Sequence, residues 1–184
     1  MFKKVIIKIT KALDKFNIPH MIIGGQAVLF YGEPRFTRDI DITLGLEIND
    51  LELFLKIISR LKFKPLTKNV QKFVSDTMVL PVSDISSGIR IDFIFSNSEF
   101  EKEAIKRVKK VKYNGTTIKI ASLEDVVIHK MVAGRPRDIE DIVAILSKNP
   151  EFDSRYILSW LRKFDLMLEK NLTTHFKKIR PDYI

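Results

Sequence analysis

The spacing of apolar and polar positions predicts that helices alternate with short strands up to about residue 121. Apolar residues recur at helical intervals, with lysines between them, from Phe2 to Phe16. The segment 17–19, with its proline, ends this helix, and the apolar run 20–23 behind it has the length of a strand. Gly24-Gly25 and a short helix follow. Residues 38–44 then alternate, which predicts a strand with one apolar and one polar face.

The rest of the chain continues this pattern and then becomes purely helical. The further predicted elements are a helix capped by Asn49 or Asp50 that runs to about Leu61, strands over 73–82 and 89–95, a helix over 99–108, and a hairpin over 111–120 that turns at Asn114-Gly115. Ser122 with Asp125 forms a capping-box pattern, and Pro136 can open another helix. We therefore predict an α+β fold, with an α/β core over 1–121 and a helical part over 122–184 packed on it.

The sequence is basic and contains no cysteine. Its 32 Lys and Arg residues exceed its 23 Asp and Glu residues, which gives a formal net charge of +9 at pH 7. This excess favours a polyanionic partner, either a nucleic acid or a nucleoside triphosphate, although a lysine-rich solvated surface would give the same count. The lack of cysteine excludes disulfides, thiolate metal sites and cysteine nucleophiles.

No apolar run in the sequence has the length of a membrane span, so we expect no membrane partner. Near the N-terminus, Lys8 and Lys11 interrupt the apolar stretch that a signal peptide would need. A cytoplasmic location is therefore expected.

Two carboxylates stand side by side on the polar face of the strand 38–44. Asp39 and Asp41 are two residues apart, and residues two apart on a strand point to the same side. Their repulsion is costly in a partly buried place. A divalent cation relieves it, because Mg²⁺ prefers hard oxygen ligands and shares them with phosphates. The alternative is a solvated pair of acids that bonds to Arg35 or Arg38.

Asp92 is a third candidate ligand because it interrupts the strongly apolar strand 89–95. Acidic side chains are rarely buried without a partner. If this strand lies beside that of Asp39 and Asp41, three carboxylates converge, as a two-metal phosphoryl-transfer site requires. The third acid can then serve as the base for an acceptor hydroxyl. Taken alone, Asp92 would more simply pair with Arg90 or a lysine.

Gly24-Gly25 joins a strand to a helix. Such a turn lets backbone N–H groups approach a phosphate closely, and the helix N-terminus adds a favourable dipole. A glycine pair is more often only a tight turn. The sequence has neither Gly-x-Gly-x-x-Gly nor Gly-Lys-Ser/Thr, so a Rossmann or P-loop nucleotide site is disfavoured.

The stretch 24–41 combines these features in one order: a glycine pair, a short helix and Asp-x-Asp, with the local sequences Tyr-Gly-x-Pro-Arg and Thr-Arg-Asp-Ile-Asp. It resembles the signature of the polymerase-β-like nucleotidyltransferase superfamily. It is particularly similar to the AbiEii-type group, which includes nucleotidyltransferase toxins of type IV toxin–antitoxin systems. A second match, over 122–141, resembles the helical motif in which that group places a lysine and nearby basic residues that handle the triphosphate.

The resemblance implies a mixed, twisted sheet flanked by helices. It also implies transfer of a nucleoside monophosphate from an NTP, such as ATP, with release of pyrophosphate. Asp39, Asp41 and Asp92 would be the catalytic acids and would bind two Mg²⁺ ions, or Mn²⁺ in their place. Gly24 and Gly25 would hold the triphosphate.

Two basic residues are further candidates for nucleotide binding. By the resemblance, Lys130 would contact the triphosphate. A lysine is a compact charge suited to phosphate, but without the motif it would equally be a solvated residue on a helix face. Arg38 either neutralises phosphate or pairs with the neighbouring acids, and we favour the pairing.

The acceptor is the least constrained part of the prediction. We expect an RNA such as tRNA, because the basic charge favours a nucleic acid over a small cationic molecule. The resemblance then suggests the toxin of a toxin–antitoxin pair, with a separately encoded antitoxin as a further partner. The alternatives are a small hydroxylated acceptor, as in aminoglycoside-modifying relatives, and a non-catalytic nucleotide- or RNA-binding module on the same fold. Three clustered acids argue against the last of these.

Overall fold

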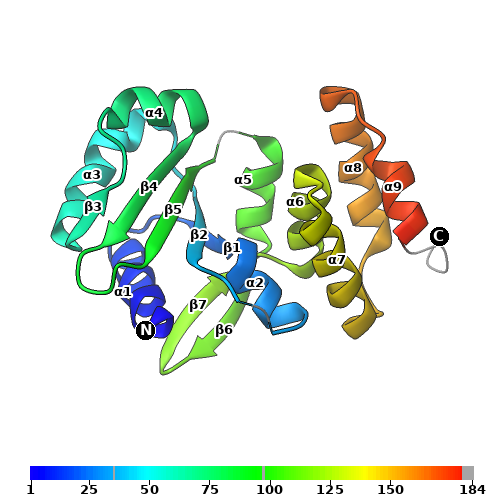
Figure 1. Ribbon diagram of the computed structural model, residues 1–184, viewed down its shortest axis with the longest axis horizontal. Helices are drawn as coiled ribbons and strands as arrows, with labels where there is room; N and C mark the ends of the chain where they lie inside the picture. The colour runs from blue at the N-terminus through cyan, green and yellow to red at the C-terminus, as the bar shows by residue number, and fades with distance from the viewer. Residues whose placement is uncertain (35, 97, 180–184) are drawn as a thin grey trace. The chain divides into compact units, whose positions relative to one another are not determined.

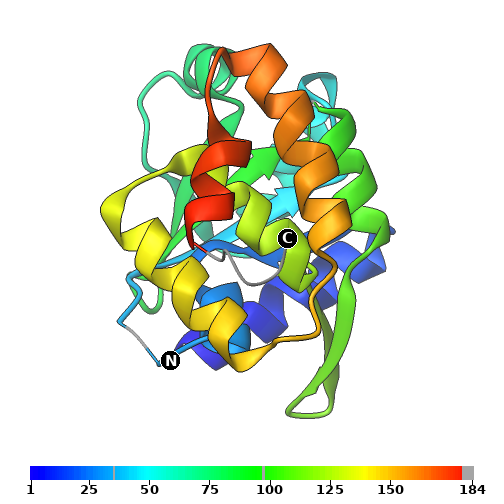
Figure 2. The same cartoon turned by 90° about the vertical axis from the view of Figure 1, so that its right-hand side faces the viewer.

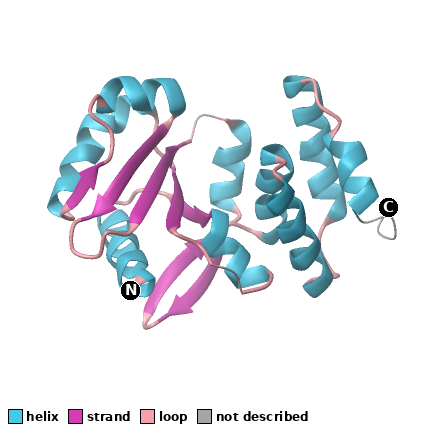
Figure 3. Cartoon of the chain, viewed as in Figure 1, coloured by secondary structure: helices cyan, strands magenta, loops and turns pink. Residues whose placement is uncertain are grey.

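The strands form a mixed sheet in the computed structural model, which describes residues 1–34, 36–96 and 98–179. Over these residues the sheet has seven strands in the order β3-β4-β5-β2-β1-β7-β6 (Figures 1 and 3). The strands are β1 (His20–Ile23), β2 (Asp39–Leu44), β3 (Phe63–Pro65), β4 (Val79–Asp84), β5 (Arg90–Phe95), β6 (Lys109–Tyr113) and β7 (Thr116–Ile120). Pairing is parallel for β2–β5 and β1–β7 and antiparallel for the other pairs. The predicted α+β fold is confirmed.

The chain divides into two compact units, residues 1–26 with 36–121 and residues 27–35 with 122–184. The helices that begin in the first unit are α1 (Phe2–Lys15), α2 (Gly24–Tyr31), α3 (Leu51–Arg60), α4 (Val70–Thr77) and α5 (Glu99–Lys106), with a short 3-10 turn, η1 (Ile48–Asp50), before α3. The second unit contains α6 (Leu123–Ala133), α7 (Pro136–Lys148), α8 (Ser154–Leu168) and α9 (Leu172–Ile179).

The apolar face of the two central strands explains their register. Ile40 lies opposite Ile91, Ile42 opposite Phe93, and Leu44 opposite Phe95, and all six side chains are buried. Phe54 of α3 packs edge-on against the rings of Phe93 and Phe95, with centroids 5.0 and 5.9 Å away. Because side chains alternate along a strand, a slip of one residue would turn the polar face into this core. The core therefore holds the polar side chains of β2 and β5 on the opposite face.

The predicted strand over 73–82 is wrong in its first half, where the chain forms α4. Asn69 caps this helix by accepting a hydrogen bond from the Lys72 N–H at 3.1 Å. Met78 ends it in the left-handed conformation, with φ 58°, and β4 begins at the next residue. Local capping at both ends outweighs the strand preference of the apolar residues between. The short β3, which pairs with β4, has no counterpart among the predicted strands.

In the second unit, α6 packs against α7, α8 and α9 (Figure 2). Ser122 caps α6 by accepting from the Asp125 N–H at 3.2 Å, which is one half of the predicted capping box. The Asp125 carboxylate accepts from the Ser122 hydroxyl at 2.6 Å. Pro136 opens α7 as predicted. The segment 27–35 belongs to this unit because the end of α7 bonds to it. Lys148 Nζ donates to the Gly32 carbonyl at 3.1 Å, and Asn149 Nδ2 donates to the Tyr31 carbonyl at 2.9 Å. Among the described residues, no helix is both long and apolar enough to cross a membrane.

Candidate active site

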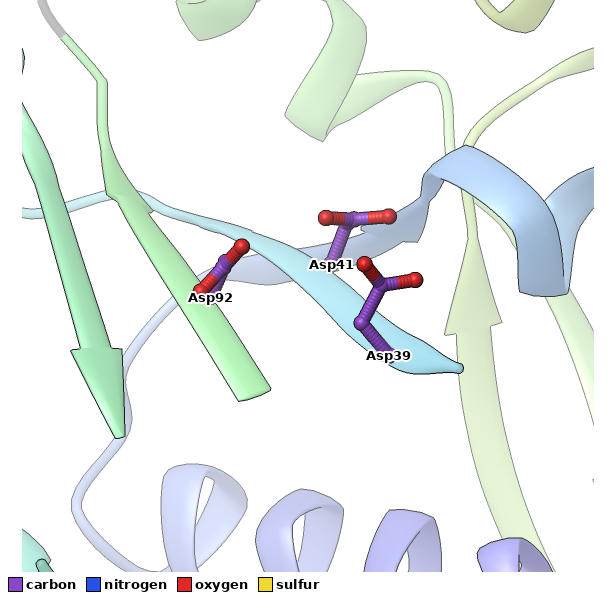
Figure 4. Close-up of side chains that lie close together, drawn as sticks. All are labelled: Asp39, Asp41 and Asp92. Carbon is purple, nitrogen blue, oxygen red and sulfur yellow. The ribbon is translucent and has the colours of Figure 1, made fainter. Parts of the chain in front are cut away.

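The three predicted carboxylates lie together on the polar face of β2 and β5. Asp41 lies directly opposite Asp92 in the parallel register, and Asp39 projects from the same side of β2 (Figure 4). One carboxylate oxygen from each residue lies within 4.8 Å of the other two. β2, which carries Asp39 and Asp41, pairs directly with β5, which carries Asp92. The predicted convergence of the three carboxylates required this pairing.

Asp41 carries the strongest electrostatic perturbation of the cluster. Its pKa is raised from 3.8 to about 6, mainly by burial and next by the negative charges of Asp39 and Asp92. A backbone hydrogen bond from Gly25 and the positive charge of Arg90 oppose this rise. The ionised form of Asp41 is therefore under-stabilised, and a cation placed among the three acids would stabilise it.

Gly24 lies against the Asp41 carboxylate. A Cβ atom built on Gly24 would lie 1.9 Å from Asp41 Oδ2 and 2.7 Å from its Cγ. Gly24 also has φ +60°, a conformation that side-chain-bearing residues rarely adopt. The glycine turn thus has a direct role beside the acids: Gly24 leaves room for the carboxylate, and Gly25 donates its N–H to it.

Arg90 provides the positive charge nearest to Asp92. Its Nε donates to Asp92 Oδ1 at 2.9 Å and its Nη2 to Oδ2 at 3.0 Å, a bidentate pair. The ion pair of Asp92 with Arg90, which the sequence offered as the simpler alternative, is therefore present. Asp92 also lies in the cluster with Asp39 and Asp41. Just before β2, Thr37 Oγ1 donates to Asp39 Oδ1 at 3.2 Å. The contact of Thr37 with Asp39 was not predicted from the sequence.

The donor set fits a divalent cation. Carboxylate oxygens are the ligands that Mg²⁺ prefers, and phosphate oxygens of a substrate can complete its coordination. Asp39, Asp41 and Asp92 are each partly exposed, so a substrate can reach them. The pKa of Asp41 is raised first by burial and then by the charges of Asp39 and Asp92, and the guanidinium of Arg90 opposes this rise.

The two predicted basic residues have other contacts. The Arg38 guanidinium lies over the Phe36 ring, 5.8 Å from its centre. Within the part of the chain that the structure describes, it forms none of the ion pairs with acids that we favoured. Lys130 belongs to the second unit, where it is buried. Its Nζ lies 2.8 Å from Asp138 Oδ1 and 2.7 Å from Asp141 Oδ2.

The acids around Lys130 were missed from the sequence, although a signal was present. Asp138 and Asp141 are three residues apart on the helix that Pro136 opens, so they share one face of it. An apolar helix with a single lysine, followed by a helix with two acids on one face, is the pattern of a buried ion pair between helices.

Several solved structures share the architecture of this protein. The solution structure of the antibiotic-resistance factor ANT(2'')-Ia matches with a TM-score of 0.64 at 15% identity, over 91% of this chain and 94% of that chain. An antigenic nucleotidyltransferase-like protein from Paracoccidioides brasiliensis matches with a TM-score of 0.57 at 16% identity, over 90% and 87%. The lincomycin-bound lincosamide adenylyltransferase LnuA matches with a TM-score of 0.54 at 14% identity, over 77% and 94%. At these identities the likeness shows the fold, which is that of the nucleotidyltransferases.

The family follows from the sequence. The family model described as nucleotidyl transferase AbiEii toxin, type IV TA system, matches residues 19–180. This chain belongs to that family and is a nucleotidyltransferase, which confirms the resemblance seen in its motifs. The family implies an NTP substrate and a toxin–antitoxin context, and nucleotidyltransferases generally use divalent metals. A search of curated protein sequences found no relative.

Proposed function

We propose that this protein transfers a nucleoside monophosphate from an NTP, with ATP as the first candidate, to a hydroxyl group of an RNA such as tRNA. Asp39, Asp41 and Asp92 are the catalytic acids in this proposal. The observation that carries it is the parallel register of β2 and β5, which sets Asp41 beside Asp92 and leaves Asp39 on the same face.

The proposed chemistry is a single displacement at phosphorus. The acceptor oxygen bonds to the α-phosphorus of the NTP, the bond from that phosphorus to the pyrophosphate oxygen breaks, and Asp92 accepts the acceptor proton. Asp39 and Asp41 would hold two divalent cations, Mg²⁺ or Mn²⁺, and Asp92 would share one of them. When bound, these ions would neutralise charge on the triphosphate and on the acceptor oxygen.

The residues around the acids position them in this proposal. Gly24 and Gly25 hold the Asp41 carboxylate at the end of β1, and Arg90 fixes the orientation of Asp92 by its bidentate bond. Binding of the triphosphate by the glycine turn, Arg38 and Lys130 stays a prediction from the motifs.

An RNA acceptor is supported by charge and by family. The net charge of +9 favours a polyanionic acceptor, because Lys and Arg that neutralise phosphates release counterions. The family is that of type IV toxin–antitoxin nucleotidyltransferases. We therefore propose that the protein acts in the cytoplasm as a toxin on an RNA such as tRNA, and that a separately encoded antitoxin opposes it.

A small hydroxylated acceptor is the second candidate. The fold is shared with ANT(2'')-Ia, which has been solved with adenylyl-2''-tobramycin, and with LnuA, which has been solved with lincomycin. A cationic aminoglycoside would be repelled by a protein of charge +9, and this argues for the RNA.

One assay separates the candidates. The protein is incubated with each α-labelled NTP, Mg²⁺, total tRNA and a set of aminoglycosides and lincosamides. Asp39→Asn and Asp92→Asn variants are run beside Asp76→Asn, which removes one charge from an exposed position on α4. The proposal expects label on RNA with wild type and Asp76→Asn, and loss of about a thousandfold or more in both site variants. Label on a small molecule alone would establish the second candidate instead.

A further inference from the structure

The second unit contains a pocket that the proposed chemistry does not use. Its volume is about 570 Å³, within the range of roughly 300–1,000 Å³ usual for small-ligand sites. The end of α6, one residue of α7, the turn before α9, and α9 itself supply its walls. The lining residues are Met131, Val132, Ala133, Gly134, Ile139, Lys170, Asn171, Leu172, His175, Lys178 and Ile179.

The lining separates into an apolar floor and a basic rim. Met131, Val132, Ala133, Ile139, Leu172 and Ile179 supply the apolar part of the lining, and Met131 and Leu172 are its most buried members. The exposed side chains of Lys170, His175 and Lys178 stand at its edge. Among the described residues that line the pocket there is no Asp or Glu. A ligand that fits this lining has an apolar part and an anionic part next to it.

Asp165 sets the start of the helix that borders the pocket. Asp165, on α8, accepts hydrogen bonds from the backbone N–H groups of Leu172 and Thr173, so its carboxylate caps α9. This cap fixes the first turn of α9. His175 and Lys178 are three residues apart on that helix and therefore share the face that borders the pocket.

We propose that this pocket binds an unpaired nucleotide of the acceptor RNA, with the base on the apolar floor and the adjoining phosphates at Lys170 and Lys178. The inference rests on the proposed RNA acceptor and deepens it. Proteins read single-stranded RNA by taking splayed-out bases onto apolar or aromatic surface while basic side chains follow the backbone. A base presents apolar faces next to a phosphate, which is the combination that this lining matches.

The test compares two double variants that remove the same charge from the same unit. Lys170→Gln/Lys178→Gln removes the two rim lysines, and Lys163→Gln/Lys177→Gln removes two exposed lysines that do not line the pocket. Binding of fluorescent tRNA is measured by anisotropy from 50 to 300 mM KCl. Because the rim variant can no longer neutralise two phosphates, the slope of log K against log salt should fall by about 1.4, and affinity at low salt by about tenfold or more. The control pair should weaken binding by less than about threefold.

A third variant and a crosslinking experiment make the test independent of charge and of folding. Ala133→Phe narrows the pocket without changing charge, and it should also weaken tRNA binding. Thermal unfolding reports whether each variant is folded. In wild type, tRNA that carries 4-thiouridine should crosslink on irradiation to peptides from 131–134 or 170–179. Equal losses of affinity in the two double lysine variants, or crosslinks confined to other peptides, would overturn the proposal that this pocket binds RNA.

The label-transfer assay tells a failure of the pocket from a failure of the proposed function. If wild type adds nucleotide to RNA and the rim variant binds tRNA normally, the pocket assignment alone is wrong. If wild type binds tRNA through the pocket but adds nucleotide to no RNA, the pocket stands and the proposed reaction is wrong.

Discussion

Replacement of Asp41 by asparagine should stabilise the metal-free protein at neutral pH. Asparagine keeps an oxygen that can accept from the Gly25 N–H, and it removes the negative charge that burial and the neighbouring acids oppose. The pKa of Asp41 rises from 3.8 to about 6 on folding. At about 1.4 kcal/mol per pKa unit, this corresponds to about 3 kcal/mol of unfolding free energy above pH 6. For a chain of this length, the melting temperature should rise by roughly 6–12 °C.

The effect has a defined pH window. Below pH 3.8 the carboxyl group is protonated in both the folded and the unfolded state, so the substitution gains nothing. Between 3.8 and about 6 the folded state keeps a proton that the unfolded state has lost. The contribution of Asp41 to wild-type stability is therefore fully present below 3.8 and is lost as pH rises through about 6.

Urea unfolding in EDTA, followed by circular dichroism at pH 3.8, 5 and 7.5, measures this directly. The advantage of Asp41→Asn over wild type should be near zero at pH 3.8, intermediate at pH 5 and largest at pH 7.5. Asp76→Asn, on the exposed side of α4, removes one charge without this environment and should change little. A stabilisation that is the same at all three pH values, or absent at pH 7.5, would refute the electrostatic reasoning.

Three further outcomes are expected at the glycine turn, at Lys130 and at the acids. Gly24→Ala should lose about 1–3 kcal/mol of stability and most transfer activity, because of its positive φ and the carboxylate beside it. Gly115→Ala, with φ +77° and open space around it, should lose stability but keep activity. Lys130→Met should lower the unfolding free energy by roughly 3–5 kcal/mol, because it removes the ammonium shared by the buried Asp138 and Asp141; an unchanged denaturation midpoint would contradict this. Mg²⁺ affinity, measured by calorimetry, should fall as pH drops below about 6, because protons compete for the carboxyl of raised pKa; a pH-independent affinity would argue against cation binding at the acids.

Most elements of the fold could be predicted because their patterns are local. The alternation in β2 and β5 and the helical spacing in α1 and α3 each arise from one apolar face, and the structure buries those faces. The strand predicted over the residues of α4 was wrong because the ends of this helix determine it. Asn69 caps its start, and Met78 adopts the left-handed conformation after its last turn. An apolar-polar pattern does not report these terminal conformations.

The residues of the candidate site could be predicted from the sequence, but the tertiary contacts that bring them together could not. Asp39 and Asp41 share a face by strand geometry alone. The position of Asp92 depends on which strand lies beside β2, and this is a long-range pairing. The partners of Lys130 lie on a different helix and depend on how α6 and α7 pack. Sequence spacing predicts which side chains share a face, whereas packing decides which faces meet.

The pairing of β2 with β5 also bears on how the protein folds. In the chain, α3, β3, α4 and β4 all lie between these two strands, so the pair closes a long loop. Long-range parallel pairing is slow to form, because the entropy cost of closing the loop comes before the stabilisation that the paired strands provide. A cation that needs acids from both strands has no complete ligand set until the loop closes. It therefore binds the native chain rather than guiding the unfolded one, and by mass action it raises the stability only of the state in which β5 has joined β2.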